Sequence, residues 1–486
     1  MHEAARIRKN SLFSFLSISS RLVANVFVFW IIGSHYGPQA FGQFTTAHTI
    51  ATILILFADF GFDILLTTEI AKNRNEAEKI FKDYFSIKII FTTLALISMW
   101  TLSLLSSFSP TSRLLIFIFS FYVILTTLTN FLYGLYKGFE KLQYETGVSL
   151  IINILLLISI LILLFLKIRI EFIAGAFVLT RLIGFIVAIY SSYKVLPALK
   201  YTLTFKNWHK IKKQVLIFGL QLIFGNLFFQ LDTLLLAFWK GDVDVGIYQA
   251  AFKLIALPLV IPDILINTLL PVLSRLNFEN ELLWVKLGGL LNKTLALISL
   301  PISIILFTYS EFVIKLIYPI KNYGATVPIL KIFSIILFIR FSVETYALML
   351  TTSHRQKTRM IIVLCGTLLN FGLNYYIIPI YGPFGAAIIS LVTNLLVGLG
   401  YIVTTMPLFL KWTLNFSYII SIAFSVMASI LLWNIKQFYP IVIIPIVFVV
   451  CFLFFLMLGY GKEERELIFK KGNNFPNIFT LYKFKI

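Results

Sequence analysis

Long apolar stretches alternate with short polar connectors along the whole chain. A helix needs about 20 mainly apolar residues to cross the hydrocarbon core of a bilayer, and fourteen stretches reach that length. The pattern therefore predicts an all-α integral membrane protein with about 14 transmembrane helices. The expected spans are 12–33, 41–64, 84–106, 112–135, 147–166, 170–191, 214–237, 247–272, 290–310, 327–351, 359–380, 383–409, 415–434 and 438–460.

The basic residues of the connectors predict the orientation. If the N-terminus lies in the cytoplasm, 27 of the 41 Lys and Arg residues fall in cytoplasmic connectors and tails and 7 in outer loops. Cytoplasmic loops carry the excess of Lys and Arg in membrane proteins. An even number of spans places both ends on one side, so both termini are expected in the cytoplasm.

The composition agrees with a chain embedded in a lipid bilayer. Hydrophobic residues make up 59% and charged residues 13%, against about 25% charged in an average soluble domain. The 41 basic against 21 acidic residues could suggest a nucleic-acid partner, but their place in short connectors excludes that reading. Cys365 and Cys451 lie in apolar stretches and form no disulfide framework or metal site. The first apolar stretch is too long for a signal-peptide core and is expected to remain as a helix.

The chain repeats itself at an offset of 204 residues. IRKNSL (7–12) falls on IKKQVL (211–216), and GQFTTA (42–47) falls on GIYQAA (246–251). At the same offset Asp59 meets Asp263 and Asp63 meets Asn267. Because six spans separate the copies, both halves have the same orientation, as in transporters built from parallel repeats.

The repeat predicts the domain organisation. We expect two six-helix lobes related by a pseudo-twofold axis along the membrane normal. Residues 1–200 form the N-terminal lobe and residues 201–410 the C-terminal lobe. Residues 411–486 add two helices and a basic cytoplasmic tail.

Three segments resemble a known family. YGPQAFGQF (36–44), DVGIYQAAFKL (244–254) and YYIIPIYGPFGAAIISLVTN (375–394) resemble segments of Wzx-type polysaccharide flippases, in the polysaccharide branch of the multidrug/oligosaccharidyl-lipid/polysaccharide exporter superfamily. The resemblance covers about residues 5–410. Its glycines and prolines are turn and packing devices that indicate the fold rather than the chemistry.

The resemblance implies a function. It implies a flippase of the bacterial cytoplasmic (inner) membrane that moves polyprenyl-pyrophosphate-linked oligosaccharide units from the cytoplasmic to the periplasmic leaflet by alternating access. Such units serve the synthesis of surface polysaccharide, including the O-antigen of lipopolysaccharide. The implied partners are this lipid-linked oligosaccharide, the bilayer and, as further candidates, polysaccharide polymerase machinery and H⁺ or Na⁺ as coupling ion.

Basic residues inside the spans are the candidates for binding the pyrophosphate. A charge near the bilayer centre costs about 2.5–3.5 kcal/mol on insertion scales, so its presence needs a reason. Arg21 lies roughly 15 Å into the first span, without an acid in the same span and with Asn25 one turn further on the same face. A guanidinium binds phosphate oxygens with two parallel hydrogen bonds, although a structural salt bridge is the alternative. The further candidates are Arg181, Arg340, Lys88 and Lys293.

Acidic residues inside the spans are candidates for a gate or for ion coupling. Asp59 and Asp63 lie one helical turn apart near the cytoplasmic end of their span, and Asp263 is the repeat equivalent of Asp59. Such acids either close an inner gate by pairing with Lys88 and Lys293 or carry a coupling ion. Asp232 lies towards the outer end of its span, and Glu344 lies one turn from Arg340.

Other classes of function require sequence features that this chain lacks. There is no phosphate-binding loop of the G-x-x-x-x-G-K-[ST] type, the five His residues are scattered, and the outer loops are too short for the catalytic loop expected of a membrane polymerase or ligase. No catalytic residue, cofactor or metal is therefore predicted. Two alternatives remain open: an ion-coupled exporter of drugs or small cations from the same superfamily, and a non-transporting scaffold of a glycan-assembly complex.

Overall fold

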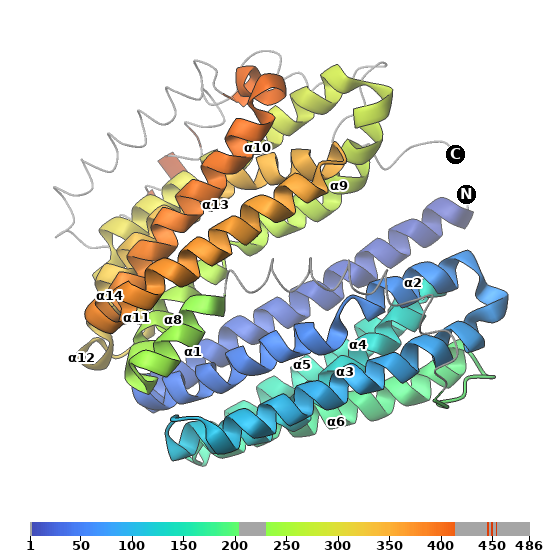
Figure 1. The fold of residues 1–486 in the computed structure, drawn as a ribbon, viewed down its shortest axis with the longest axis horizontal. Helices are drawn as coiled ribbons and strands as arrows, with labels where there is room; N and C mark the ends of the chain where they lie inside the picture. The colour runs from blue at the N-terminus through green and yellow to red at the C-terminus, as the bar shows by residue number, and fades with distance from the viewer. Residues whose placement is uncertain (1, 204–229, 414–444, 447–448, 451–452, 454–486) are drawn as a thin grey trace. The chain divides into compact units, whose positions relative to one another are not determined.

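The computed structural model describes residues 2–203 and 230–413, with residues 445–446, 449–450 and 453 beyond them (Figure 1). Within these ranges the chain is helical and has no β-strand. The elements are α1 His2–Asp59, α2 Phe62–Lys72, η1 Arg74–Glu76, α3 Ala77–Leu105, α4 Pro110–Gly138, α5 Leu142–Phe165, α6 Ile170–Val195, α8 Asp242–Ala256, α9 Val260–Glu279, α10 Glu281–Thr308, α11 Ser310–Ile317, α12 Ile320–Tyr323, α13 Thr326–Thr352 and α14 Gln356–Thr413.

The helices have the length and hydropathy of membrane spans. Within the described ranges, eight helical stretches pass this test, or nine when the bent pair α8 and α9 is taken as one span. Two of them, Ser20–Lys72 and Gln356–Thr405, are 53 and 50 residues long, enough for two crossings each at about 1.5 Å per residue. The predicted all-helical, multi-pass membrane fold is confirmed. The expected span 415–434, most of 438–460 and the first part of 214–237 lie outside the described residues.

Glycines bend the longest helices where the sequence predicts turns. Gly37, at φ 79°, divides α1 into two arms, and Gly382, at φ 57°, divides α14 in the same way. A positive φ is readily adopted only by glycine, and Pro38 suits the first turn of the arm that follows. Gly241, 204 residues after Gly37, also has a positive φ of 93°. The repeat is thus seen in the backbone conformation of Gly37 and Gly241 as well as in the amino-acid sequence.

The two repeat-equivalent turns pack against each other reciprocally. A Cβ atom built on Gly42 would lie 1.6 Å from the carbonyl oxygen of Asp242, and one built on Gly246 would lie 1.9 Å from the carbonyl oxygen of Pro38. Gly246 and Asp242 are the residues 204 positions after Gly42 and Pro38. The contact therefore has local twofold symmetry, and glycine is required on both sides because the backbones touch.

The chain divides into two compact units. One comprises Met1–Lys253 with Ile317–Tyr323 and Thr367–Ala386, and the other comprises Leu254–Leu316, Gly324–Gly366 and Ala387–Ile486. These units are defined by contacts between residues. The lobe boundaries at residues 200 and 410, which follow from the sequence repeat, stay a prediction.

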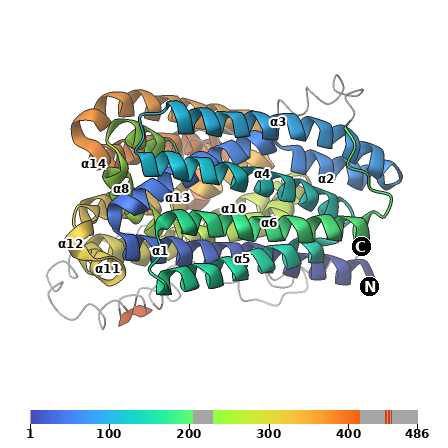
Figure 2. The ribbon, with the colours of Figure 1, turned by 90° about the horizontal axis from the view of Figure 1, so that it is seen from below.

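The first unit is organised around α4. This helix packs against α1, α2, α3 and α6, while α5 packs against α1 and α6 (Figure 2). At one end, aromatic residues such as Phe81, Phe131 and Tyr136 form a buried core. In the second unit, α10 packs against α13 and α9, around a core that includes Trp284 and Phe341.

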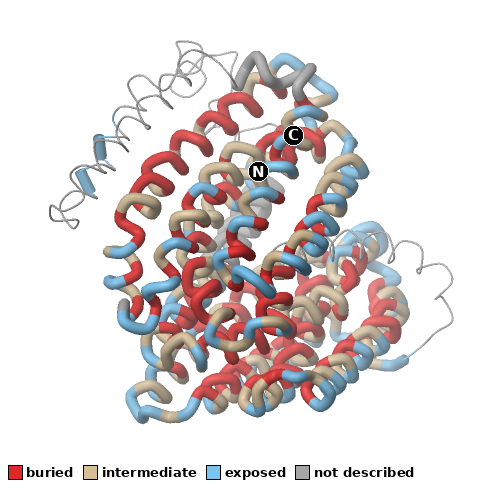
Figure 3. The backbone as a smooth tube through the Cα atoms, turned by 60° about the vertical axis from the view of Figure 1, so that its left-hand side comes forward, coloured by how far each residue is buried: buried red, intermediate tan, exposed pale blue. Residues whose placement is uncertain are grey.

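Apolar side chains also cover much of the outside. Figure 3 shows exposed stretches along the helices, and Phe165 and Leu105 remain 89% and 81% exposed. A soluble monomer rarely exposes large contiguous apolar patches. Lipid chains remove that penalty, so this distribution is the one expected for helices that face a bilayer.

Candidate functional site

A polar pocket lies among the helices of the first unit. It has a volume of about 220 Å³ and is lined by α1, α4, α5 and α6. Both arms of α1 contribute, because the bend at Gly37 folds the second arm back beside the first. The lining residues are Arg21, Ala24, Asn25, His48, Thr52, Ile55, Tyr122, Thr126, Asn130, Tyr133, Ser149, Ile152, Asn153, Leu156, Phe177 and Arg181.

Two arginines and no carboxylate line this pocket. Arg21 comes from the first arm of α1 and Arg181 from the middle of α6. The guanidinium carbon of Arg181 lies 5.3 Å from the centre of the Tyr122 ring, a cation–π distance that fixes the head group. Among the described residues, neither arginine forms an ion pair with an acid. Two uncompensated cations in one membrane-embedded pocket favour an anionic ligand.

Aromatic rings enclose one side of the pocket around His48. The His48 ring centre lies 4.9 Å from that of Phe29 and 5.7 Å from that of Phe119, both edge-on. Phe177 lies 6.1 Å away, and Lys253 places its ammonium 3.7 Å from the centre of the Phe29 ring. Aromatic rings thus surround His48, while Thr126, Asn130 and Asn153 add hydroxyl and amide groups to the lining.

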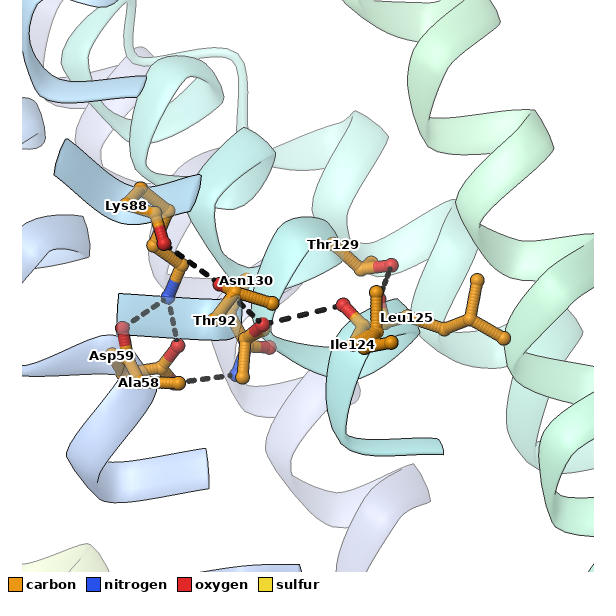
Figure 4. Close-up of polar contacts among 9 residues, drawn as sticks. Ala58, Asp59, Lys88, Thr92, Ile124, Leu125, Thr129 and Asn130 are labelled. Atoms are coloured by element: carbon orange, nitrogen blue, oxygen red, sulfur yellow. Dashed lines mark hydrogen bonds and ion pairs between the residues drawn. The ribbon is translucent and has the colours of Figure 1, made fainter. Parts of the chain in front are cut away.

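A buried ion pair connects the pocket to a break in the helix. Lys88 on α3 pairs with Asp59 and donates to the carbonyl oxygen of Ala58 at 3.0 Å. Asn130, a lining residue of the pocket, donates its amide to the other carboxylate oxygen of Asp59 at 3.0 Å (Figure 4). Lys88 is only 1% exposed, and the Asp59 carboxylate supplies its counter-charge.

The helix breaks directly after Asp59. Phe60 and Gly61 have φ values of 39° and 78°, and α2 begins at the next residue. Asp63 lies in the first turn of α2, and its backbone packs against Gly134 on α4. The ion pair therefore lies at the joint between α1 and α2.

Asp232 lies in a separate network. Its carboxylate accepts hydrogen bonds from the Tyr248 hydroxyl at 2.6 Å and from the Asn374 amide at 2.8 Å. Asn374 also donates to the oxygen of Asn370 at 3.0 Å. All four side chains belong to the first unit, and Asp232 is 4% exposed.

The remaining candidates belong to the second unit. Arg340 is within electrostatic reach of Glu344 and Asp263, and Glu344 also lies 3.8 Å from Arg359. Lys293 is fully buried, like Lys88, which lies at a nearly equivalent place in the repeat, at an offset of 205 residues.

The structure thus brings only some of the expected site residues together. Arg21, Asn25 and Arg181 line one pocket, and Lys88 meets Asp59 beside it. The other candidates lie elsewhere, and the roles of all of them stay predictions. The polar wall of the pocket, formed by hydroxyl and amide side chains of α4 and α5, was not predicted from the sequence. Its signal was present in the span 112–135, where Tyr122, Thr126, Asn130 and Tyr133 recur at helical spacing.

A family profile decides the assignment. The family described as "Polysaccharide biosynthesis protein" matches residues 7–277, which is more than half of the chain. The chain belongs to this family. The predicted relationship to proteins of polysaccharide biosynthesis is thereby confirmed. No curated protein sequence matches the chain.

Solved structures share the fold of this polysaccharide biosynthesis family member. The lipid II flippase MurJ in an inward closed conformation is 17% identical, with a TM-score of 0.73 over 92% of this chain and 99% of that chain. An inward-facing MATE-family multidrug transporter of the MOP superfamily is 16% identical, with a TM-score of 0.60 over 81% and 98%. A MOP superfamily transporter from Pyrococcus furiosus, described as having a binding pocket of reverse polarity, is 17% identical, with a TM-score of 0.57 over 83% of this chain and 96% of that chain.

Proposed function

We propose that the protein is a flippase that moves polyprenyl-pyrophosphate-linked oligosaccharide units from the cytoplasmic to the periplasmic leaflet for surface polysaccharide synthesis. The observation that carries this proposal is the pair Arg21 and Arg181 in one polar pocket without a carboxylate. The family supplies the polysaccharide context. The fold supplies the architecture of a transporter.

The chemistry of the pocket suits a pyrophosphate. Two guanidinium groups present planar forks of N–H donors, which bind phosphate oxygens in parallel pairs. Charge-assisted hydrogen bonds of this kind strengthen away from bulk water. The same anion removes the cost of holding two cations among membrane helices. The polyprenyl tail needs no polar site and stays in the lipid.

We further propose that the ion pair beside the pocket acts in gating. The Asp59–Lys88 pair lies at the break between α1 and α2, where Phe60 and Gly61 adopt positive φ. Asp63, Asp263 and Glu344 are further candidates for gating. Lys293 and Arg340 are candidates for contacts with substrate in the second half. Asp232, with its buried network, is the candidate for a coupling ion, H⁺ or Na⁺.

The orientation belongs to the same proposal. The excess of Lys and Arg in alternate connectors supports a bacterial cytoplasmic membrane protein with both termini in the cytoplasm. A polymerase of the assembly pathway is the natural recipient of the translocated unit.

An exporter of drugs or small cations is the second candidate, because MATE transporters share the fold. A pocket for cations is expected to carry acidic residues. The pocket described here has two arginines and no acid among its lining residues, so this candidate fits less well.

Transport of a lipid-linked oligosaccharide in reconstituted vesicles tests the proposal. Arg21→Ala is expected to abolish translocation at normal protein abundance, and Arg21→Lys to restore part of it, because a point charge cannot reproduce the bidentate fork. Arg169→Ala is the control, since Arg169 is exposed and pairs with Glu171 at 2.7 Å outside the pocket. Normal translocation by the Arg21→Ala variant would contradict the proposal.

A further inference from the structure

Two buried hydroxyl groups in the pocket have no hydrogen-bond partner. They belong to Thr126 and Tyr133, which each line the pocket and are 6% exposed. Neither oxygen makes a hydrogen bond within the described part of the chain. A buried polar group without a partner costs about 1–3 kcal/mol, so such groups are rare in native proteins and need an explanation.

Neighbouring residues of the same type on the same helix are satisfied. Thr129 turns its hydroxyl back to the carbonyl oxygen of Leu125 at 2.6 Å, which is the usual arrangement for threonine inside a helix. The hydroxyl of Tyr136 donates to the carbonyl oxygen of Ala188 at 2.5 Å. The two hydroxyls without partners are therefore confined to the face of α4 that lines the pocket.

Two amides extend this polar wall. Asn130 commits its NH₂ group to Asp59, and Asn153 on α5 commits its NH₂ group to Ser20 at 3.0 Å and Ser149 at 3.4 Å. In both side chains the carboxamide oxygen is left as an acceptor. The wall thus offers two hydroxyls, which both donate and accept, and two acceptors.

This set of groups matches a sugar rather than a second phosphate. Sugar hydroxyls donate and accept, whereas phosphate oxygens only accept and would find no donors on the amide oxygens. The rings of Tyr122 and Phe177 add apolar surface. The volume of about 220 Å³ is below the range of about 300–1,000 Å³ typical of drug-sized ligands, so the pocket is too small for an oligosaccharide.

We propose that Thr126, Asn130, Tyr133 and Asn153 form a subsite for the sugar attached directly to the pyrophosphate. This inference rests on the proposed function, in which Arg21 and Arg181 hold the pyrophosphate. The subsite makes the wall from α4 and α5 the element that distinguishes one lipid-linked glycan from another. A sugar with a missing or misplaced hydroxyl leaves the buried groups of the wall unpaired. Such a sugar binds much more weakly, so the wall discriminates strongly between glycans.

Binding of two kinds of lipid to the purified full-length protein tests the subsite. One is bare polyprenyl pyrophosphate, and the other is the same lipid carrying a single glucose, galactose or N-acetylglucosamine. For the wild type, at least one sugar-bearing lipid is expected to bind more tightly than the bare lipid. Tyr133→Phe and Thr126→Val should each reduce that advantage about fivefold, the value of a typical hydrogen bond, and leave binding of the bare lipid unchanged.

Tyr136→Phe and Thr129→Val are the matched controls, because they remove the same atoms from the same helix outside the pocket. They should keep the sugar preference. Without ligand, Tyr136→Phe should lower the melting temperature, since it breaks a satisfied hydrogen bond. Tyr133→Phe should leave it unchanged or raise it, since it removes an unpaired polar group.

The outcomes separate the subsite from the proposed function. If neither kind of lipid binds to the wild type, the proposed function and the subsite fall together. If the bare lipid binds but no sugar adds affinity, or if Tyr133→Phe and Thr126→Val keep the full sugar preference, the subsite is wrong and the proposed function stands.

Discussion

Gly42 lies directly against the carbonyl oxygen of Asp242, so closely that a Cβ atom on this glycine would fall 1.6 Å from the oxygen. The repeat-equivalent Gly246 makes the same contact with Pro38, at 1.9 Å. Two copies of one turn, 204 residues apart, thus touch through their backbones. The Asp242 carboxylate also accepts hydrogen bonds from the hydroxyls of Ser109 at 2.7 Å and Ser112 at 2.8 Å, at the start of α4.

Alanine at Gly42 should disrupt this contact. The neighbouring atom is backbone and cannot turn away, so Gly42→Ala should destabilise the packing of the two turns by about 1–3 kcal/mol, the usual cost of overpacking, and lower the melting temperature in detergent. Gly175→Ala is the control, because a Cβ atom there meets nothing within 4 Å and alanine favours a helix. An unchanged melting temperature for Gly42→Ala would show that the turns do not pack as described.

The Asp59–Lys88 pair predicts a large effect of single substitutions. Lys88 is 1% exposed, so Asp59→Asn should leave a buried ammonium without its counter-charge. Breaking a buried pair in this way costs about 3–5 kcal/mol, and the abundance of folded protein in membranes should fall. The double variant Asp59→Asn, Lys88→Met should recover much of that loss, because both charges are gone. Strictly additive losses would show that the two side chains act independently.

Labelling of single cysteines tests the orientation. In a variant without Cys365 and Cys451, cysteines introduced at Ser107 and Lys240 should react from outside with a membrane-impermeant thiol reagent. Cysteines at Asn73 and Arg355 should react only after the membrane is opened. The four positions lie at helix ends in the structure. The reverse pattern would overturn the orientation derived from the loop charges.

Much of the fold could be predicted because lipid imposes a simple pattern. The spans 84–106 and 112–135 correspond to α3 and α4, and the turn at YGPQAFGQF is the bend at Gly37. The short helices α11 and α12 in the connector after α10 were not expected. Their packing is tertiary, since Tyr323 on α12 donates to the carbonyl oxygen of Gly33 at 2.7 Å, and no local pattern encodes such a contact.

The candidate site was harder to predict than the fold. An arginine inside an apolar span stands out in the sequence, so Arg21 and Arg181 were found. That they line the same pocket depends on the rotation of α1 and α6 about their axes, which the uniformly apolar spans leave undetermined. Thr126 and Tyr133 did not stand out, because Thr and Tyr are common in membrane helices, and only the structure separates them from Thr129 and Tyr136.

Binding of bare polyprenyl pyrophosphate, compared with the monophosphate, tests the central claim most directly. Two guanidinium groups in one pocket should favour the lipid with two phosphates. Arg21→Ala and Arg181→Ala should each remove that preference. The double variant should lose no more affinity than the single variant with the larger loss, because both guanidinium groups act on one ligand. The wild type should bind the pyrophosphate tightly, and both variants should lose this binding at normal protein abundance. Equal binding of both lipids by the wild type, or unchanged binding by both variants, would show that the pocket is not a pyrophosphate site.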